Sequence, residues 1–267
     1  MRITRTIGAL WVALAVHWAQ AADFASLARG ADVVNQQLYA AATQRANPSA
    51  MYALGVECEE ESNLAAAFRW FKLAAALGHA ESMKRIGDMY AAGHGLPQDY
   101  VAASAWYGRA VRRGSIDAVS SLAALYFYGF GVPQSYPRAV ELLSSAVRRG
   151  DAQAQEKLGT LYESGVGLTR SPRRARNLYE RSVAQGYAPA MVDLGLLYIE
   201  AIGVPRDDVH GYALISAGVA IGIPDPMTKL ASDEISVASD RLDQGQIADA
   251  QRLARTLVST ASEGNTR

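Results

Sequence analysis

The sequence repeats itself with a period of 36 residues. Glycine recurs at this spacing at Gly78, Gly114, Gly150, Gly186 and Gly222. A short polar residue recurs at the same spacing at Asn63, Asp99, Ser135, Ser171 and Asp207. Tyrosine does so at Tyr90, Tyr126, Tyr162 and Tyr198. Because several independent columns share one period, the chain is predicted to be a tandem repeat protein whose units pack against their neighbours.

Each repeat is predicted to hold two helices. The polar column suits the residue that precedes a helix and accepts hydrogen bonds from its free N–H groups. The glycine fifteen residues after each polar residue suits the left-handed residue that ends the helix. Between the two, apolar residues fall on one helical face at Ala67, Trp70, Phe71 and Ala74. Trp106 holds the position of Trp70 one repeat later, so we expect both indoles to be buried.

The helix before each polar cap, called the first helix of a repeat, has its own apolar stripe. A clear example is Met83, Ile86, Gly87 and Tyr90. A glycine inside a helix costs about 1 kcal/mol relative to alanine, so its recurrence predicts a close approach between the first helix and the second helix. A glycine-rich link, such as residues 129–133, joins the two helices of a repeat.

These signals together resemble the Sel-one-like repeat family, whose 36-residue units are relatives of the tetratricopeptide repeat. The match runs through Leu-Gly-x-x-Tyr, Gly-x-Gly-Val and an Asp or Ser cap, and covers about residues 50 to 222 as five repeats. The fifth repeat departs from the pattern because Ala201 replaces the first glycine of the link. The resemblance implies an all-α fold, a right-handed α-solenoid of helix-turn-helix repeats. It also implies a non-enzymatic scaffold or adaptor that binds a protein or peptide on its concave face.

The chain is predicted to have four parts. Residues 1–21 have the pattern of a signal peptide, in which Arg2 and Arg5 precede an apolar run and small residues precede cleavage after Ala21. Residues 22–48 are expected to form an N-terminal capping helix, residues 49–223 the five repeats, and residues 224–267 a C-terminal half-repeat and capping helix. We therefore expect a bacterial periplasmic or secreted protein with no stable membrane insertion after signal removal. An uncleaved signal anchor is the alternative.

Composition argues against several classes of partner and site. Lysine plus arginine and aspartate plus glutamate are equal at 26, so no overall charge favours a nucleic-acid partner. The single cysteine, Cys58, excludes an internal disulfide. It falls in the tyrosine column, so we expect a buried inert thiol, with a reactive thiol as the alternative. The histidines His79, His94 and His210 occupy different positions of different repeats, and neither a metal site nor a cofactor is expected.

Catalytic motifs are absent from the sequence. It contains no Gly-x-Ser-x-Gly, Ser-x-x-Lys or His-Glu-x-x-His pattern. We therefore expect no enzymatic activity. The alternative is a cell-wall or polysaccharide-related enzyme, or an accessory subunit of one, because catalytic residues drawn from different repeats would leave no local motif.

A candidate binding surface lies opposite the apolar stripe on the first helices. The resemblance implies that this face lines the concave side of the solenoid. The residues predicted to bind a protein or peptide there are Arg85, Asp88, Ser121, Tyr128, Phe130, Lys157, Thr160, Asp193 and Glu200. Tyr128 and Phe130 are the expected anchors, since aromatic residues are enriched at binding hot spots. A second interpretation of Phe130 is that it fills a gap between adjacent repeats.

The fourth repeat is rich in arginine. The residues concerned are Arg170, Arg173, Arg174, Arg176 and Arg181. One interpretation is a solvated outer face. The other is a surface for an anionic partner, such as an acidic protein or a cell-envelope polymer. A protein or peptide within a cell-envelope complex is the main expected partner.

Overall fold

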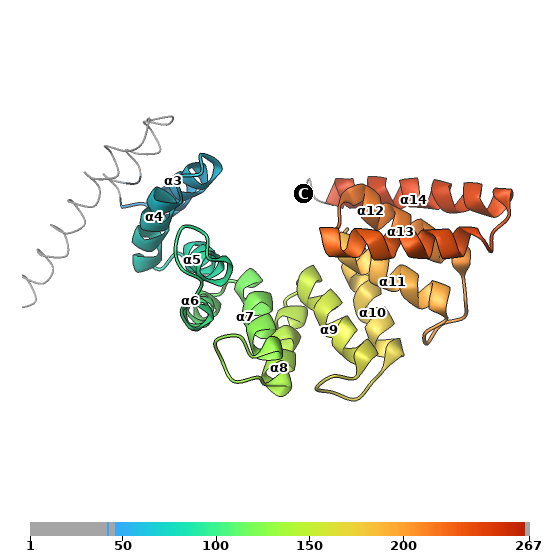
Figure 1. The fold of residues 1–267 in the computed structure, drawn as a ribbon, viewed down its shortest axis with the longest axis horizontal. Helices are drawn as coiled ribbons and strands as arrows, with labels where there is room; N and C mark the ends of the chain where they lie inside the picture. Colours follow the sequence, from blue (N-terminus) through green and yellow to red (C-terminus); the bar gives the residue numbers. More distant parts are fainter. Residues whose placement is uncertain (1–41, 43–45, 265–267) are drawn as a thin grey trace, which may run out of the picture. The chain divides into compact units, whose positions relative to one another are not determined.

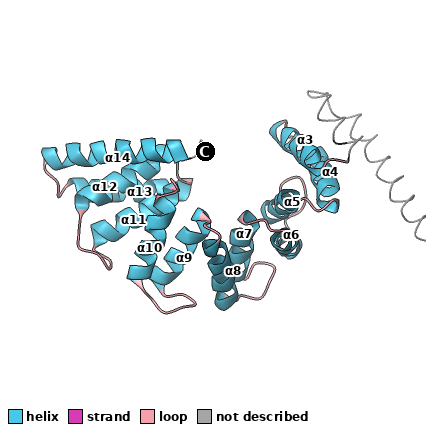
Figure 2. Cartoon of the chain, turned by 180° about the vertical axis from the view of Figure 1, so that it is seen from behind, coloured by secondary structure: helices cyan, strands magenta, loops and turns pink. Residues whose placement is uncertain are grey.

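The computed structural model describes residue 42 and residues 46–264 (Figure 1). Within them the chain forms helices joined by loops and turns, with no strand (Figure 2). The expected signal peptide, residues 1–21, and nearly all of the expected capping helix, residues 22–48, lie outside the described residues. None of the described helices is both long enough and apolar enough to span a membrane.

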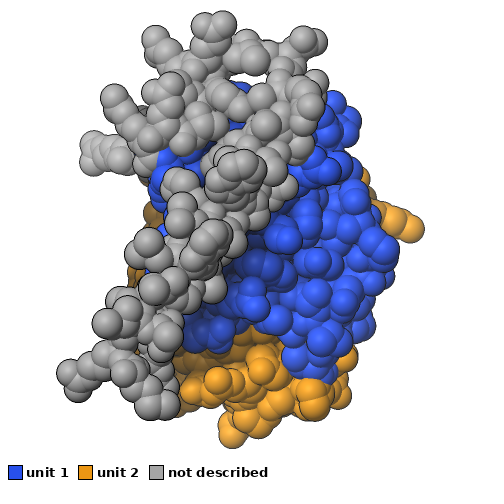
Figure 3. All heavy atoms as spheres, turned by 90° about the vertical axis from the view of Figure 1, so that its left-hand side faces the viewer, with its two compact units in different colours: residues 1–118, 130–132 blue, residues 119–129, 133–267 orange. Residues whose placement is uncertain are grey.

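Twelve helices follow one another in the described part of the chain. They are α3 (Pro48–Glu60), α4 (Leu64–Ala76), α5 (Ala80–Ala92), α6 (Tyr100–Arg112), α7 (Asp117–Tyr128), α8 (Tyr136–Arg148), α9 (Ala152–Ser164), α10 (Pro172–Val183), α11 (Ala188–Glu200), α12 (Asp208–Ile221), α13 (Asp225–Ser239) and α14 (Gln244–Gly264). The chain divides into two compact units. Met1–Ala118 and Phe130–Val132 belong to the first unit, and Val119–Gly129 and Pro133–Arg267 to the second (Figure 3).

Helices that are neighbours in the chain pack against one another within each unit. In the first unit, α3 packs against α4, α4 against α5, and α5 against α6. In the second unit the succession continues from α8 through α9, α10 and α11 to α12. There α12 also packs against α13 and α14, the two helices that follow it. This succession of packed helices confirms the predicted all-α solenoid of helical repeats.

The polar column caps the second helices of the repeats. The Asp99 carboxylate accepts hydrogen bonds of 2.9 Å from the backbone N–H groups of Val101 and Ala102 at the start of α6. Three other members of the column accept a backbone hydrogen bond at the start of their own helices: Asn63, Ser135 and Asp207. Ser171 differs, since its side chain makes no capping hydrogen bond to α10. The predicted caps are therefore confirmed except at Ser171.

Glycines inside the first helices let aromatic side chains of the second helices approach closely, as predicted. A Cβ atom on Gly159 of α9 would lie 2.5 Å from the ring of Tyr179 on α10. A Cβ atom on Gly87 of α5 would lie 2.5 Å from the ring of Tyr107 on α6. Both tyrosines are buried. The packing between the helices thus offsets the helix propensity that each glycine costs.

The two tryptophans that share one column differ in burial. Trp70 on α4 is 1% exposed, as predicted. Trp106 on α6 is only half-buried, so the prediction of an equally buried indole was wrong. The guanidinium group of Arg109 lies 4.5 Å from the centre of the Trp106 ring and covers one of its faces. The inward aromatic side chain of α6 is instead Tyr107, which is buried in the same way as Phe71 on α4.

The fifth repeat keeps the turn of its link without the glycine. Ala201 ends α11 with a φ angle of 58°, in the left-handed region that favours glycine. Gly165 ends α9 in the same conformation, with a φ angle of 76°. Ala201 therefore keeps the turn but adds backbone strain, which is about 1–2 kcal/mol for a left-handed residue with a side chain.

Candidate peptide-binding site

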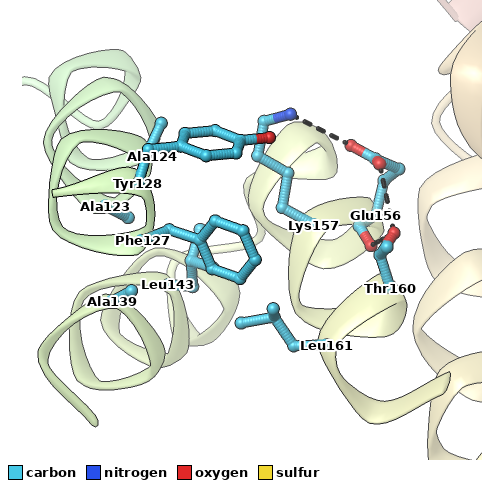
Figure 4. A pocket seen from close by; sticks show the side chains of 10 residues that line it. All are labelled: Ala123, Ala124, Phe127, Tyr128, Ala139, Leu143, Glu156, Lys157, Thr160 and Leu161. Atoms are coloured by element: carbon cyan, nitrogen blue, oxygen red, sulfur yellow. Dashed lines mark hydrogen bonds and ion pairs between the residues drawn. The ribbon is translucent and has the colours of Figure 1, made fainter. Parts of the chain in front are cut away.

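A pocket of about 220 Å³ opens in the second unit between α7, α8 and α9 (Figure 4). Its apolar side is formed by Ala123, Ala124, Phe127, Ala139, Leu143 and Leu161. Its polar side is formed by three residues of α9: Glu156, Lys157 and Thr160. Tyr128 completes the lining, and Figure 4 shows its ring extending from α7 toward the Lys157 side chain. The pocket thus joins an aromatic and aliphatic wall to a charged one.

Small residues on α7 make room for this pocket. Ala123 and Ala124 precede Phe127 and Tyr128 by about one helical turn and lie on the same side of the helix. The rings of Phe127 and Tyr128 meet edge to face with their centres 4.9 Å apart. Tyr128 is 60% exposed. The structure therefore places an accessible aromatic ring where the sequence predicted one.

The polar wall of the pocket is an ion pair with a hydroxyl beside it. Lys157 Nζ lies 3.6 Å from Glu156 Oε2. The Thr160 hydroxyl lies 3.4 Å from Glu156 Oε1 and donates a hydrogen bond of 3.3 Å to the main-chain oxygen of Glu156. The side chain of Glu156 is 13% exposed and that of Lys157 is 39% exposed. The ammonium group is therefore the accessible member of the pair, and the carboxylate lies deeper.

A second carboxyl group, that of Asp193 on α11, lies against Glu156. Its Oδ2 atom is buried and has no hydrogen-bond partner among the described residues. Burial first, and then the charges of Glu156 and Glu163, raise the pKa of Asp193 well above its usual value. Burial also raises the pKa of Glu156, although Lys157 opposes this shift. Asp193, one of the residues predicted to bind a partner, is half-buried and does not line the pocket.

Two tyrosine hydroxyls are influenced by the charges of this pair of carboxyl groups. The Tyr179 hydroxyl lies 2.8 Å from Glu163 Oε2 and 3.2 Å from the Thr160 hydroxyl. Burial and the nearby charge of Asp193 raise the pKa of Tyr179. Burial and the charge of Glu156 raise the pKa of Tyr187 to about 12. Both phenols therefore stay protonated at neutral pH, and the Tyr179 hydroxyl donates a hydrogen bond to Glu163.

Phe127 and Glu156 were not among the residues predicted from the sequence to bind a partner. Each directly precedes a predicted residue, Tyr128 or Lys157, and so points about 100° away from the predicted helical face. The sequence signal that could have found Phe127 is the adjacent Phe-Tyr pair. The corresponding positions of the other first helices hold Ala91, Glu163 and Ile199. No comparable signal marks Glu156.

Three of the predicted site residues belong to the first unit: Arg85, Asp88 and Phe130. Arg85 pairs with Glu59 at 3.3 Å. Asp88 pairs with Lys84 at 2.9 Å and accepts a hydrogen bond of 2.9 Å from the Tyr107 hydroxyl. These local contacts give both charges a structural role within the first unit.

Phe130, the third of them, stacks on Tyr100 with ring centres 4.9 Å apart and an interplanar angle of 23°. It is still 44% exposed. The stacking favours the interpretation that Phe130 packs between neighbouring elements of the first unit. Tyr128, by contrast, belongs to the second unit, as do Ser121 and Glu200, which do not line the pocket. Of the nine predicted residues, the pocket lining therefore brings together Tyr128, Lys157 and Thr160.

A cleft of about 650 Å³ is lined in part by arginines of the fourth repeat. Arg173 and Arg174 line it together with Arg148, and its lining contains no acidic side chain. The Arg174 guanidinium lies 5.4 Å from the centre of the Tyr162 ring. The remaining arginines have local partners: Arg170 with Glu163, Arg176 with Glu180, and Arg181 with Val147. The cleft is therefore positively charged, while the rest of the arginine-rich surface is engaged within the repeat.

Cys58 is buried on α3, as predicted. Burial first, and then the charges of Glu61 and Glu57, raise the pKa of its thiol. A raised pKa disfavours the thiolate, the nucleophilic form of cysteine. Among the described residues, no group of three or more His, Cys, Asp or Glu side chains is arranged to hold a metal ion.

Known proteins share both the repeats and the fold. The Sel1 repeat matches residues 48–79, 80–115, 116–151, 152–187 and 188–216. No protein with a curated description matches this sequence significantly. A solved structure of c5321, a protective antigen of uropathogenic Escherichia coli with an SLR fold, is 23% identical with a TM-score of 0.72. The alignment covers 83% of this chain and 48% of c5321, so this chain spans about half the length of that protein.

Two other Sel1 repeat structures are also similar. The protein from Oxalobacter formigenes is 26% identical with a TM-score of 0.59, and the alignment covers 68% of this chain and 76% of that protein. The one from Klebsiella pneumoniae is 20% identical with a TM-score of 0.51, over 77% of this chain and 97% of that protein. The five matched repeats together take up more than half of the sequence. The chain therefore belongs to the Sel1 repeat family.

Proposed function

We propose that this protein binds a peptide segment of a protein partner in the pocket between α7, α8 and α9. Sel1 repeats form a scaffold fold of the protein-interaction type. The observation that supports this particular site is the pocket itself, which joins the exposed Tyr128 ring to the charged wall of Lys157 and Thr160. The protein would then act as a scaffold or adaptor without chemistry of its own.

The dimensions of the pocket favour a peptide side chain over a small molecule. Small-molecule sites have volumes of about 300–1,000 Å³ and enclose most of the ligand. The present pocket, at about 220 Å³, is smaller, and the exposed Tyr128 ring forms part of its lining. Its size suits one or two side chains of a chain that continues across the surface. Tyrosine is one of the residue types that contribute most to such interfaces.

Replacing Tyr128 with alanine is expected to weaken peptide capture by at least about tenfold while changing the free energy of unfolding by less than about 1 kcal/mol. The reason is that the ring is 60% exposed and so contributes more to the pocket wall than to the core. Capture is measured by selecting a displayed library of short random peptides against the immobilised protein and measuring the affinity of the recovered peptides. Thermal melts report the stability.

Two further variants serve as controls for this test. Tyr128→Phe keeps the ring and is expected to retain most of the affinity. Val237→Ala removes an exposed apolar side chain from α13, outside the pocket, and is expected to retain all of it. A Tyr128→Ala protein that melts far below the wild type would show that the ring belongs to the core. A Tyr128→Ala protein that folds and binds the peptides at full affinity would place the binding site elsewhere.

We also propose that the protein is exported to the periplasm or beyond, where its partner would belong to a cell-envelope complex. This proposal is supported by the signal-peptide pattern of residues 1–21. The mature protein is then expected to begin with Ala22-Asp23. Intact-mass measurement on periplasmic material tests this directly. Recovery of the uncleaved N-terminus in the membrane fraction would contradict it and favour a signal anchor.

A further inference from the structure

The basic cleft of the fourth repeat is a second candidate interaction surface in the second unit. It is lined by the C-terminal half of α8, by α9 and by the first two turns of α10. Each of the three helices contributes one buried apolar side chain: Val147, Leu158 and Leu178. Three exposed arginines line it as well: Arg148, Arg173 and Arg174. An occupant that matches this lining combines an apolar side chain with anionic groups.

The preceding repeat neutralises the arginine that corresponds to Arg174. In α8, Arg138 pairs with Glu141, which lies three residues later on the same helix. One period of 36 residues further on, the same two positions hold Arg174 and Asn177 of α10. The cation is therefore kept while its carboxylate is replaced by a neutral amide, and both residues line the cleft. Arg174 contacts the uncharged Tyr162 ring and makes no ion pair with any described residue.

The start of α10 adds to this positive charge. Acidic side chains are favoured in the first turn of a helix, and cations are favoured at the opposite end. The first turn of α10 has no acidic residue and holds Arg173 and Arg174. The one acidic residue of α10, Glu180, pairs with Arg176 at 3.4 Å. The Ser171 hydroxyl also lines the cleft and makes no capping hydrogen bond to its own helix. A carboxylate from outside would complement all of these groups.

We propose that this cleft binds an acidic segment of a protein partner, in which aspartate or glutamate side chains flank an apolar residue. The carboxylates would pair with the guanidinium groups, whose planar geometry allows two parallel hydrogen bonds to each carboxylate. The apolar residue would contact Val147, Leu158 and Leu178. A polymer of phosphate or sugar acid groups has no apolar side chain for this contact, so the lining favours a peptide.

This inference goes beyond the proposed function and is independent of it. The cleft and the pocket that contains Tyr128 share no lining residue. At about 650 Å³ the cleft is also larger than that pocket, which has about 220 Å³. It therefore has room for several side chains of one segment. Variants of the two sites can be compared with the same set of peptides.

The test selects a displayed library of short random peptides against the immobilised full-length protein. The wild type is expected to enrich peptides in which acidic residues flank an apolar one. Combining Arg173→Gln with Arg174→Gln is expected to weaken the binding of a recovered acidic peptide by about tenfold, because two partners of its carboxylates are lost. Fluorescence anisotropy measures the affinity. Both arginines are exposed, so thermal melts are expected to match the wild type.

A pair of substitutions at Asn177 provides the matched control. Asn177→Glu restores the carboxylate that the preceding repeat has at Glu141, and its charge is expected to neutralise Arg174 from within the helix. The acidic peptide should then bind at least about fivefold more weakly. Asn177→Gln has nearly the same size without the charge and is expected to retain most of the affinity. Arg206→Gln removes an exposed arginine outside the cleft and is expected to retain all of it.

The inference would be overturned if the recovered peptides showed no excess of acidic residues. It would also be overturned if Asn177→Glu and Asn177→Gln bound an acidic peptide equally well. Inorganic polyphosphate is expected to displace the acidic peptide only at a much higher concentration of charge. Equal displacement would show that the cleft accepts any polyanion and would contradict a protein segment as its occupant.

The two sites give different patterns of loss. If the recovered peptides lose affinity for Tyr128→Ala and are unaffected by the arginine variants, the proposed function stands and this inference fails. If acidic peptides lose affinity only for the arginine variants, this inference stands and the site at Tyr128 fails. If no peptide is recovered at all, both fail.

Discussion

Trp70→Ala is expected to lower the free energy of unfolding of this protein by about 3–5 kcal/mol, the loss typical of a fully enclosed large aromatic side chain. Trp70 is 1% exposed and lies on the inward face of α4 with Ala67, Phe71 and Ala74, all of which are buried. Truncating the indole would leave a large cavity that rigid helix packing closes only in part. Urea unfolding followed by circular dichroism measures the loss.

Trp106→Ala is the matched control, because Trp106 occupies the same column one repeat later. It is half-buried and covered by Arg109, so we expect a loss of only about 1–2 kcal/mol. Because repeats contact only their neighbours, hydrogen exchange in α11 and α12 is expected to be unchanged in the Trp70→Ala protein. Equal losses at Trp70 and Trp106 would contradict the difference in burial between the two indoles.

The comparison of these tryptophans shows how much of the fold the sequence can predict. The period of 36 residues places both indoles at the same point of the same helix, and the helix boundaries and caps follow from the same columns. Burial depends further on which side chains surround the position. Arg109 and Tyr107 provide those surroundings at Trp106. A periodic pattern therefore predicts which way a side chain points better than it predicts how deeply that side chain is buried.

The candidate site shows the same limit more strongly. Tyr128, Lys157 and Thr160 could be predicted to share one surface because helical geometry alone relates them to the apolar stripe. Glu156 and Asp193 could not be predicted to meet, since they lie on separate first helices and their contact depends on how α9 and α11 pack. The position of Phe130 likewise depends on its stacking with Tyr100, which is a contact between two different repeats.

Gly131→Ala is expected to lower the free energy of unfolding by about 3–5 kcal/mol, an unusually large loss for the addition of one methyl group. Two effects add at this position. Gly131 has a φ angle of 67°, which a residue with a side chain adopts at a cost of about 1–2 kcal/mol. A Cβ atom would also overlap the backbone of Tyr100, including its carbonyl oxygen, in the first unit. Backbone atoms at the start of α6 cannot move aside as a flexible side chain would.

Gly150→Ala separates the two effects. Gly150 also has a positive φ angle, 90°, but nothing lies within 4 Å of the position its Cβ atom would take. Its substitution should therefore cost only the conformational part, about 1–2 kcal/mol. The difference between the two variants, measured by urea unfolding, then reports the close approach of the glycine link to α6. Similar losses at both glycines would mean that the backbone at Gly131 can move away from Tyr100. The link would then be conformationally tolerant, and the stacking of Phe130 on Tyr100 would shift with it, because Phe130 is bonded directly to Gly131.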